Sequence, residues 1–343
     1  MIFELAGQTG AVRQDRGTGA GSGLAGKGSA DAPGGSSAAS ARGSAGGAAA
    51  VLAGAAASGT AGTAAHFAPH GASSVSLGAV RIVLGGAVLF GLAIGHPGTR
   101  RDLTALLRSS TANRVSLAAG MVGISGYQLC FFSAVRLTGV AVGTVVAVGS
   151  GPVFAGLISR LSGGGPLTIR WTVATAGAVG GCALLIASGR AAGVSLGGVG
   201  LALVAGLCFA VYAVAAARLI SRGSSERVVM GALLGGAAVL LTPVLAASSP
   251  GWLASPRGLT VGLYLGLITV VGYLLVGWGF RTVPAPVAVT LGLAEPLVAA
   301  LLGLLVLNER LTATATAGLI LVGLALAVLA VPARSAGPAA GAS

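Results

Sequence analysis

Ten long apolar runs dominate this sequence, and each has roughly the 18 to 22 residues that a helix needs to cross about 30 Å of hydrocarbon. Hydrophobic residues make up 55% of the chain and charged residues only 8%. A soluble domain has roughly 25% charged residues. The sequence therefore predicts an all-α integral membrane protein. The predicted spans are 46–65, 75–95, 115–135, 139–159, 170–188, 198–217, 228–247, 259–280, 285–306 and 313–332.

The segments at the two ends of the chain differ from these runs. Residues 1–45 are rich in Gly, Ala and Ser, and we predict a disordered cytoplasmic tail; 333–343 are predicted to be a disordered C-terminal tail. The first span, 46–65, is the least secure, because Val51 and Leu52 are its only large aliphatic residues. We expect its insertion to depend on packing against neighbouring helices.

The basic residues predict the orientation in the membrane. With the N-terminus inside, most of the 20 Lys and Arg residues fall in cytoplasmic segments, as the positive-inside rule requires. This pattern predicts a multi-pass protein of the cytoplasmic membrane with both termini in the cytoplasm. The net charge of +13 is spread between apolar runs and forms no dense basic face, which excludes nucleic acid as a partner.

The two halves of the chain echo each other. GPVFAGL at 151–157 resembles EPLVAAL at 295–301, and a Leu-Thr pair begins 15 residues after the proline in both halves. The spans therefore divide into two sets of five, 46–188 and 198–332. Because five is odd, the second set enters the membrane inverted, which is typical of transporters that bind their substrate near the midplane. Pro152 and Pro296 are expected to interrupt two equivalent helices close to that site.

Glu295 is the only acidic residue inside any predicted span. An ionisable group in hydrocarbon costs a few kcal/mol or more and marks a functional site by default. The alternative is a structural carboxyl, protonated or paired with an arginine. Glu295 has Gly151 as its counterpart in the first half, so its role belongs to the second half alone.

Other polar residues within spans are candidates to line a substrate cavity. Arg81 extends to the membrane surface, pairs with Glu295 or binds an anionic group of a substrate. Gln128 needs a hydrogen-bond partner on a neighbouring helix or on a substrate. For the aromatic and hydroxyl candidates the alternative is a packing role; they are Tyr127, Tyr212, Tyr273 and Thr290.

Enzymatic and metal chemistry have little support. The sequence shows no Ser/His/Asp or Cys/His set. GSGLAG at 21–26 matches GxGxxG, but no apolar strand precedes it, and Pro69 breaks the helix that would align His66 with His70. We therefore expect no enzyme, no metal and no cofactor. The three cysteines are expected to be small buried hydrophobes. A GxxxG match at 177–181 favours either a close helix contact within the chain or a homodimer interface.

The chain resembles the EamA-type transporters of the drug/metabolite transporter superfamily. The similarity lies in LAEPLVAALL at 293–302 and LNERLT at 307–312, with support from FFSAVRLT at 131–138 and AVR at 79–81. It implies ten helices in two inverted five-helix repeats. The chain departs from the family at 57–60, where ASGT replaces a tryptophan-containing motif of the first helix.

The resemblance implies export of small metabolites, amino acids or drugs without ATP. We predict a secondary transporter that works by alternating access on a small-molecule substrate in the bilayer, with a proton as a candidate coupling ion. Two alternatives stay open: a non-transporting membrane receptor or assembly partner with the same fold, and a lipid-intermediate flippase.

Overall fold

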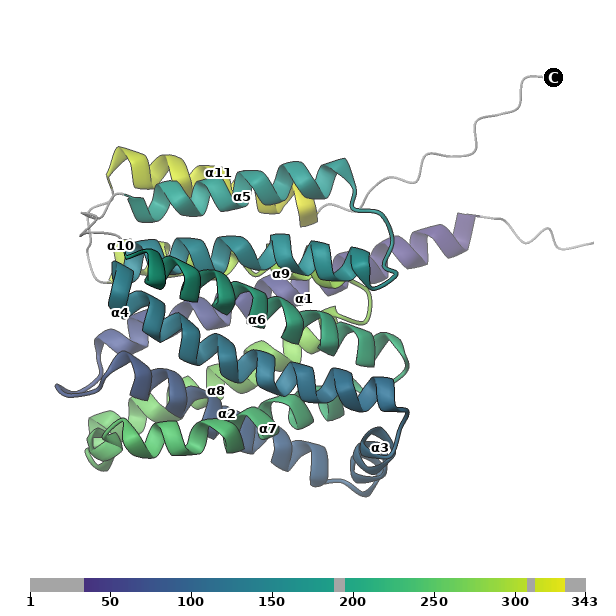
Figure 1. Cartoon of the computed structure of the whole chain (residues 1–343). Helices are drawn as coiled ribbons and strands as arrows, with labels where there is room; N and C mark the ends of the chain where they lie inside the picture. Colours follow the sequence, from purple (N-terminus) through teal and green to yellow (C-terminus); the bar gives the residue numbers. More distant parts are fainter. Residues whose placement is uncertain (1–33, 188–194, 307–311, 331–343) are drawn as a thin grey trace, which may run out of the picture.

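The computed structural model describes residues 34–187, 195–306 and 312–330, and every regular element in these ranges is helical. Most helices lie roughly side by side in one bundle (Figure 1). In chain order they are α1 (Gly34–His66), α2 (Ser74–Ile94), α3 (Pro97–Leu107), α4 (Thr111–Leu161), α5 (Ile169–Ala187), α6 (Leu196–Ser221), α7 (Glu226–Ala247), the 3-10 helix η1 (Pro250–Ala254), α8 (Pro256–Gly279), α9 (Ala285–Leu291), α10 (Ala294–Val306) and α11 (Ala313–Ala330).

Large apolar side chains cover the outside of the bundle. Leu196 is 88% exposed, Leu161 79% and Val239 73%. Such a surface is stable in hydrocarbon, whereas soluble proteins rarely expose apolar patches of this extent. Eight helices in the described ranges are long and apolar enough to cross a membrane, and Val146–Leu161 is a shorter apolar helix. The chain is therefore an all-helical, multi-pass membrane protein.

These helices can be compared with the ten predicted spans. Eight predicted spans correspond to the eight candidate membrane helices. Span 139–159 corresponds to the shorter apolar helix, and span 170–188 corresponds to α5, which lies beside α11 (Figure 1).

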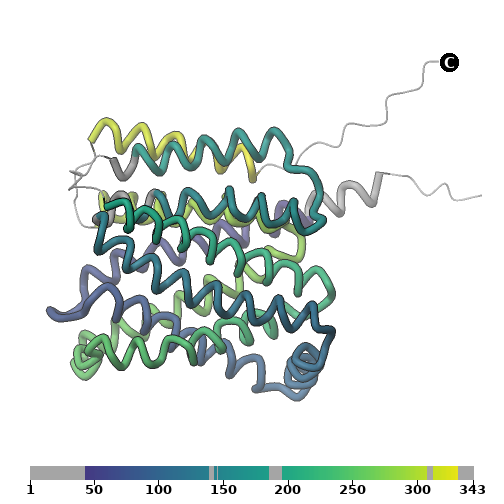
Figure 2. The backbone as a smooth tube through the Cα atoms, viewed as in Figure 1, coloured from purple at the N-terminus to yellow at the C-terminus, as the bar shows by residue number. Residues whose placement is uncertain are grey.

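Two predicted spans are joined within one helical element, α4. The chain turns back inside α4, so that Thr111–Thr138 and Val146–Leu161 run antiparallel (Figure 2). A Cβ placed on Gly143 would lie 3.1 Å from the Cα atom of Val135. Residues eight apart in a straight helix are separated by about 12 Å, so this contact requires a tight reversal. We call the two parts the first and second arms of α4.

Helical structure also appears where we predicted none. α1 begins at Gly34, inside the segment 1–45 that was predicted to be disordered. α3 occupies the predicted loop between the second and third spans. The His96 side chain caps it by accepting a hydrogen bond from the Gly98 N–H at 3.2 Å, and Pro97 takes its first turn. Figure 1 shows α3 nearly end-on, so it crosses the direction of the other helices.

Serine residues begin several of the long helices. The Ser73, Ser195 and Ser255 side chains each accept a hydrogen bond from a backbone N–H in the first turn of α2, α6 and α8. These caps satisfy donors that have no partner within the helix. Short polar signals between the apolar runs therefore set where these helices start.

The contacts between helices follow one pattern in the two halves. α2 packs against α7, and α5 against α11. α1 contacts α8 and α10, while α6 contacts both arms of α4. In the two sets of five spans, α1 corresponds to α6, α2 to α7, α5 to α11, and the two arms of α4 to α8 and α10. Exchanging counterparts leaves the pairs α2–α7 and α5–α11 unchanged and converts the contacts of α1 into those of α6. Glycines mediate matching contacts, since Gly59 of α1 lies against Glu295 of α10 and Gly206 of α6 against Ser150 of α4.

The GxxxG match lies at a contact within the chain. A Cβ on Gly181 would lie 2.7 Å from Val322 and 2.8 Å from the Gly318 carbonyl oxygen, and Gly177 faces Ala325. Gly177 and Gly181 thus let α5 and α11 approach closely. Of the two alternatives drawn from the sequence, the structure supports the contact between helices of one chain.

Candidate functional site

The ninth predicted span is broken in its middle. α9 ends at Leu291, and α10 begins at Ala294. The backbone between them turns tightly, with the Leu293 N–H donating to the Thr290 carbonyl and the Glu295 N–H donating to the Gly292 carbonyl, both at 3.0 Å. Glu295 and Pro296 therefore stand in the first turn of α10, where a carboxylate is favoured by the helix dipole.

The Glu295 side chain is exposed although its neighbours are buried. Leu291, Leu293 and Ala294 are all buried. Groups from three other helices lie within electrostatic range of the carboxylate: Arg81 of α2, Tyr127 of α4 and Tyr273 of α8. Because these groups come from three other helices, they place part of the surroundings of the carboxylate inside the bundle.

Arg81 supplies the opposite charge in this region. Its Nε atom is buried and has no hydrogen-bond partner within the described ranges. Arg81 and Glu295 do not form an ion pair at 4.0 Å or less. The Arg81 side chain as a whole is partly exposed, and the cost of leaving this one buried N–H without an acceptor is about 1–3 kcal/mol.

A series of aromatic rings in contact connects α4 to α8 through α6. Tyr127 stacks on Phe131 at 5.6 Å between ring centroids and lies 5.3 Å from Phe209. Tyr212 and Tyr273 meet edge to face at 5.7 Å. These contacts fix Tyr127 and Tyr273 near the two charges, so that the region combines a carboxylate, a guanidinium, two phenols and apolar ring faces.

Three predicted site residues are held by contacts inside the protein. The Gln128 amide donates to the Gly78 carbonyl at 3.1 Å and links α4 to α2. Thr290 is fully buried and lies 3.0 Å, oxygen to oxygen, from Thr175. The Tyr212 hydroxyl donates to Met230 Sδ at 3.5 Å. The structure therefore does not bring these three side chains to Glu295.

The two equivalent prolines differ in their effect on the helix. Pro152 is buried in the second arm of α4, and the helix continues through it, which contradicts the expected interruption. The break in the second half lies before Pro296, at Gly292 and Leu293. Gly151, the counterpart of Glu295, faces Val289 of α9, so the two equivalent segments meet near the centre of the bundle.

Gly59 of α1 is a part of this region that was not among the predicted site residues. A Cβ at this position would lie 2.7 Å from the Glu295 carbonyl oxygen and 2.8 Å from Val298 Cβ. Small residues throughout the first span were the signal for such a close approach, but they did not show which one meets α10. Glu309 lies outside the described residues.

A cavity of about 420 Å³ lies at one end of the bundle. Hydroxyl groups and two arginines line it, from the end of α4, the end of α6 and the segment between α8 and α9. Within the described ranges, no group of three or more His, Cys, Asp or Glu residues is placed to hold a metal ion.

Comparison with known proteins agrees with this architecture. The sequence model of the EamA-like transporter family matches residues 45–187 and 196–331, which together are most of the chain. The chain belongs to the EamA-like transporter family. As a member of the EamA family it is a membrane transporter and not an enzyme.

One relative by sequence and one solved structure are similar to this EamA protein over most of its length. The chain is 37% identical over 268 residues to the uncharacterized transporter YwfM of Bacillus subtilis (strain 168), covering 78% of this chain and 88% of that protein. A solved crystal structure shares the fold, with a TM-score of 0.67 at 21% identity, covering 81% of this chain and 94% of the other.

Proposed function

We propose that this EamA protein is a secondary transporter that exports a small organic solute by alternating access, with Glu295 as its central functional carboxylate. The observation that carries the proposal is the exposed carboxylate beside a break in a membrane helix, within range of Arg81 and two tyrosines. Family membership favours transport over a non-transporting receptor.

We infer ten membrane helices in two inverted repeats of five. The exchange of contacts between halves supports this arrangement, because α1 with α8 and α10 has the counterpart α6 with the two arms of α4. In inverted-repeat transporters, discontinuous helices meet near the midplane, and rocking of one repeat against the other exposes the site to each side in turn. The break between α9 and α10 fits this scheme.

The site residues in this proposal are Arg81, Tyr127, Tyr273 and Glu295, with Pro296 in the first turn of α10, directly after the helix break. The cavity of about 420 Å³ lies at the end of the bundle that the charge distribution predicts to be cytoplasmic, where an exported solute would enter. If a proton is coupled to transport, Glu295 is the group to carry it, because solute and proton would compete for one carboxylate.

The test is Glu295→Gln in reconstituted vesicles that are loaded with a panel of amino acids, amines and drugs. We expect solute efflux to fall at least about tenfold, which corresponds to roughly 1.4 kcal/mol, and to lose its dependence on pH. Asp102→Asn is the matched control, because Asp102 is exposed on α3 and lies outside both the proposed site and the lining of the cavity. Unchanged rate and pH dependence in Glu295→Gln would remove the carboxylate from the mechanism.

A further inference from the structure

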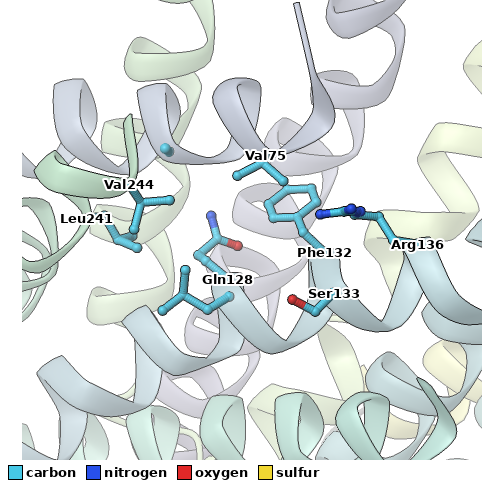
Figure 3. Close-up of a pocket in the computed structure, with 9 residues that line it drawn as sticks. Val75, Gln128, Phe132, Ser133, Arg136, Leu241 and Val244 are labelled. Carbon is cyan, nitrogen blue, oxygen red and sulfur yellow. The ribbon is translucent and has the colours of Figure 1, made fainter. Parts of the chain in front are cut away.

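A groove of about 150 Å³ lies between α2, α4 and α7, and neither Glu295 nor Arg81 is among the residues that line it (Figure 3). Its walls are mostly apolar, and its polar groups come from α4 alone. The lining residues are Val75, Ala79, Gln128, Leu129, Phe132, Ser133, Arg136, Leu241 and Val244.

The polar and aromatic residues of the groove form a row on one face of α4. Gln128, Phe132 and Arg136 are four residues apart and therefore lie one above another along the helix. The row extends over about 12 Å, from the buried Gln128 to Arg136 near the end of the first arm. Arg136 is exposed, and its guanidinium makes no hydrogen bond or ion pair with the described residues.

In the second half, the arginine at the equivalent place is paired with a carboxylate. Arg281 precedes Pro296 by 15 residues, and Arg136 precedes Pro152 by 16, so the two arginines occupy corresponding places. Arg281 lies 3.8 Å from the Glu226 carboxylate at the start of α7. Helix α2, the counterpart of α7, begins with Ser74 instead of an acid. None of the residues that line the groove is acidic. The first half thus keeps the arginine but lacks the internal anion, and a groove is found beside it.

The groove opens on a surface that faces hydrocarbon. Leu129 is 44% exposed in its wall, and Leu137 and Leu240, on the two helices beside it, are exposed as well. Arg136 stands near the end of the membrane helix Thr111–Thr138, at the depth of lipid headgroups. An apolar groove with a cation at its interfacial end matches an acyl chain joined to a phosphate.

We propose that this groove binds one anionic phospholipid, with the phosphate on Arg136 and an acyl chain against Val75, Phe132 and Val244. The guanidinium gives a charge-assisted contact to the phosphate oxygens, in the position that Glu226 takes toward Arg281 in the other half. The proposal does not depend on the role of Glu295, and its failure would leave the proposed transport function untouched.

The experiment is native mass spectrometry of the purified full chain with phosphatidylglycerol or phosphatidylcholine of matched acyl chains. We expect wild type to retain at least about five times more phosphatidylglycerol, corresponding to roughly 1 kcal/mol, and Arg136→Gln to retain the two lipids equally. Arg257→Gln is the control: this arginine also lies near the end of a membrane helix, donates to the Phe67 carbonyl at 2.7 Å and should keep the preference.

A second variant tests the apolar part of the groove. Val75→Phe narrows it without changing charge and should lower retention of phosphatidylglycerol. Equal retention by wild type and Arg136→Gln would overturn the proposal, as would an equal loss in Arg257→Gln. Glycerol 3-phosphate, added as a chain-free competitor, should not displace the lipid; displacement at matched concentration would show a site for free phosphate and overturn the lipid assignment.

Discussion

At the scale of single residues, the interior of this transporter holds two opposite charges that do not touch. Arg81 and Glu295 are within electrostatic range but form no ion pair at 4.0 Å or less, and Arg81 Nε has no hydrogen-bond partner within the described ranges. A direct pair would neutralise both groups and leave nothing for a solute. Their separation leaves each charge available to a group that enters between the helices.

The Thr175–Thr290 hydrogen bond gives a prediction about a polar contact away from that site. Replacing Thr290 by Val removes the 3.0 Å contact and leaves the buried Thr175 hydroxyl without it, which costs roughly 1–3 kcal/mol. We expect thermal unfolding in detergent to show this loss while solute efflux is retained.

The double variant Thr175→Val with Thr290→Val is the control for this contact. It should be less destabilised than the sum of the two single variants, because both partners of one bond are removed together. Strict additivity, or loss of efflux in Thr290→Val with normal stability, would contradict the structural role of Thr290.

Among single residues, the sequence predicts Glu295 as a candidate site residue, but it does not predict which way the hydroxyl side chains point. Glu295 stands out in the sequence because no other predicted span contains an acid. By contrast, Thr290 and Tyr212 were as plausible as Tyr127 before their partners were known. Membrane helices are apolar on all sides, so periodicity does not show which face a hydroxyl occupies. Only the packing places Thr290 against Thr175 and Tyr212 against Met230.

At the scale of helices, the glycines of α1 explain its unusual composition. Gly54 approaches the Gly272 carbonyl of α8, and Gly59 approaches the Glu295 carbonyl of α10. A Cβ at either glycine would lie less than 3.0 Å from the facing backbone oxygen. The residues that make the first span weakly hydrophobic therefore allow α1 to fit closely between two helices of the other half.

Gly59→Ala tests whether this contact positions the carboxylate. The added methyl group would push against the Glu295 backbone, and overpacking of this kind typically costs about 1–3 kcal/mol. We expect lower thermal stability together with reduced solute efflux. Both are measured on the same purified preparation before and after reconstitution.

Gly62→Ala is the matched control on the same helix, because no atom lies within 4 Å of a Cβ at that position. It should behave as wild type in both measurements. If Gly59→Ala also behaved as wild type, α1 would not set the position of Glu295.

The sequence predicted the long helices better than the connections between them. Apolar length alone located eight of the ten spans on helices that can cross a membrane. The short helix α3 was missed, although Pro97 and the pair Leu103 and Leu106 are present in the predicted loop. With 11 residues, α3 is too short to cross a bilayer, so the apolar length of a run does not reveal it.

At the scale of the whole molecule, the inverted repeat predicts the sides on which the connections lie. His70, between α1 and α2, and Ser224, between α6 and α7, occupy equivalent places in the two halves. Inversion puts them on opposite sides of the membrane. In variants without the native cysteines, His70→Cys should react with an impermeant maleimide added outside intact cells, and Ser224→Cys only after the cells are opened. Labelling of both from one side would exclude the inverted arrangement.

The placement of α1 has a consequence for how the protein is made. α1 is the least apolar of the eight candidate membrane helices, and its close glycine contacts are with α8 and α10. Ribosomes synthesise α8 and α10 late in the chain. For most of translation, α1 therefore lacks the neighbouring helices that it packs against. Nascent chains that stop before α8 should therefore carry an α1 that leaves the bilayer readily, and completion of the C-terminal half should secure the N-terminal one.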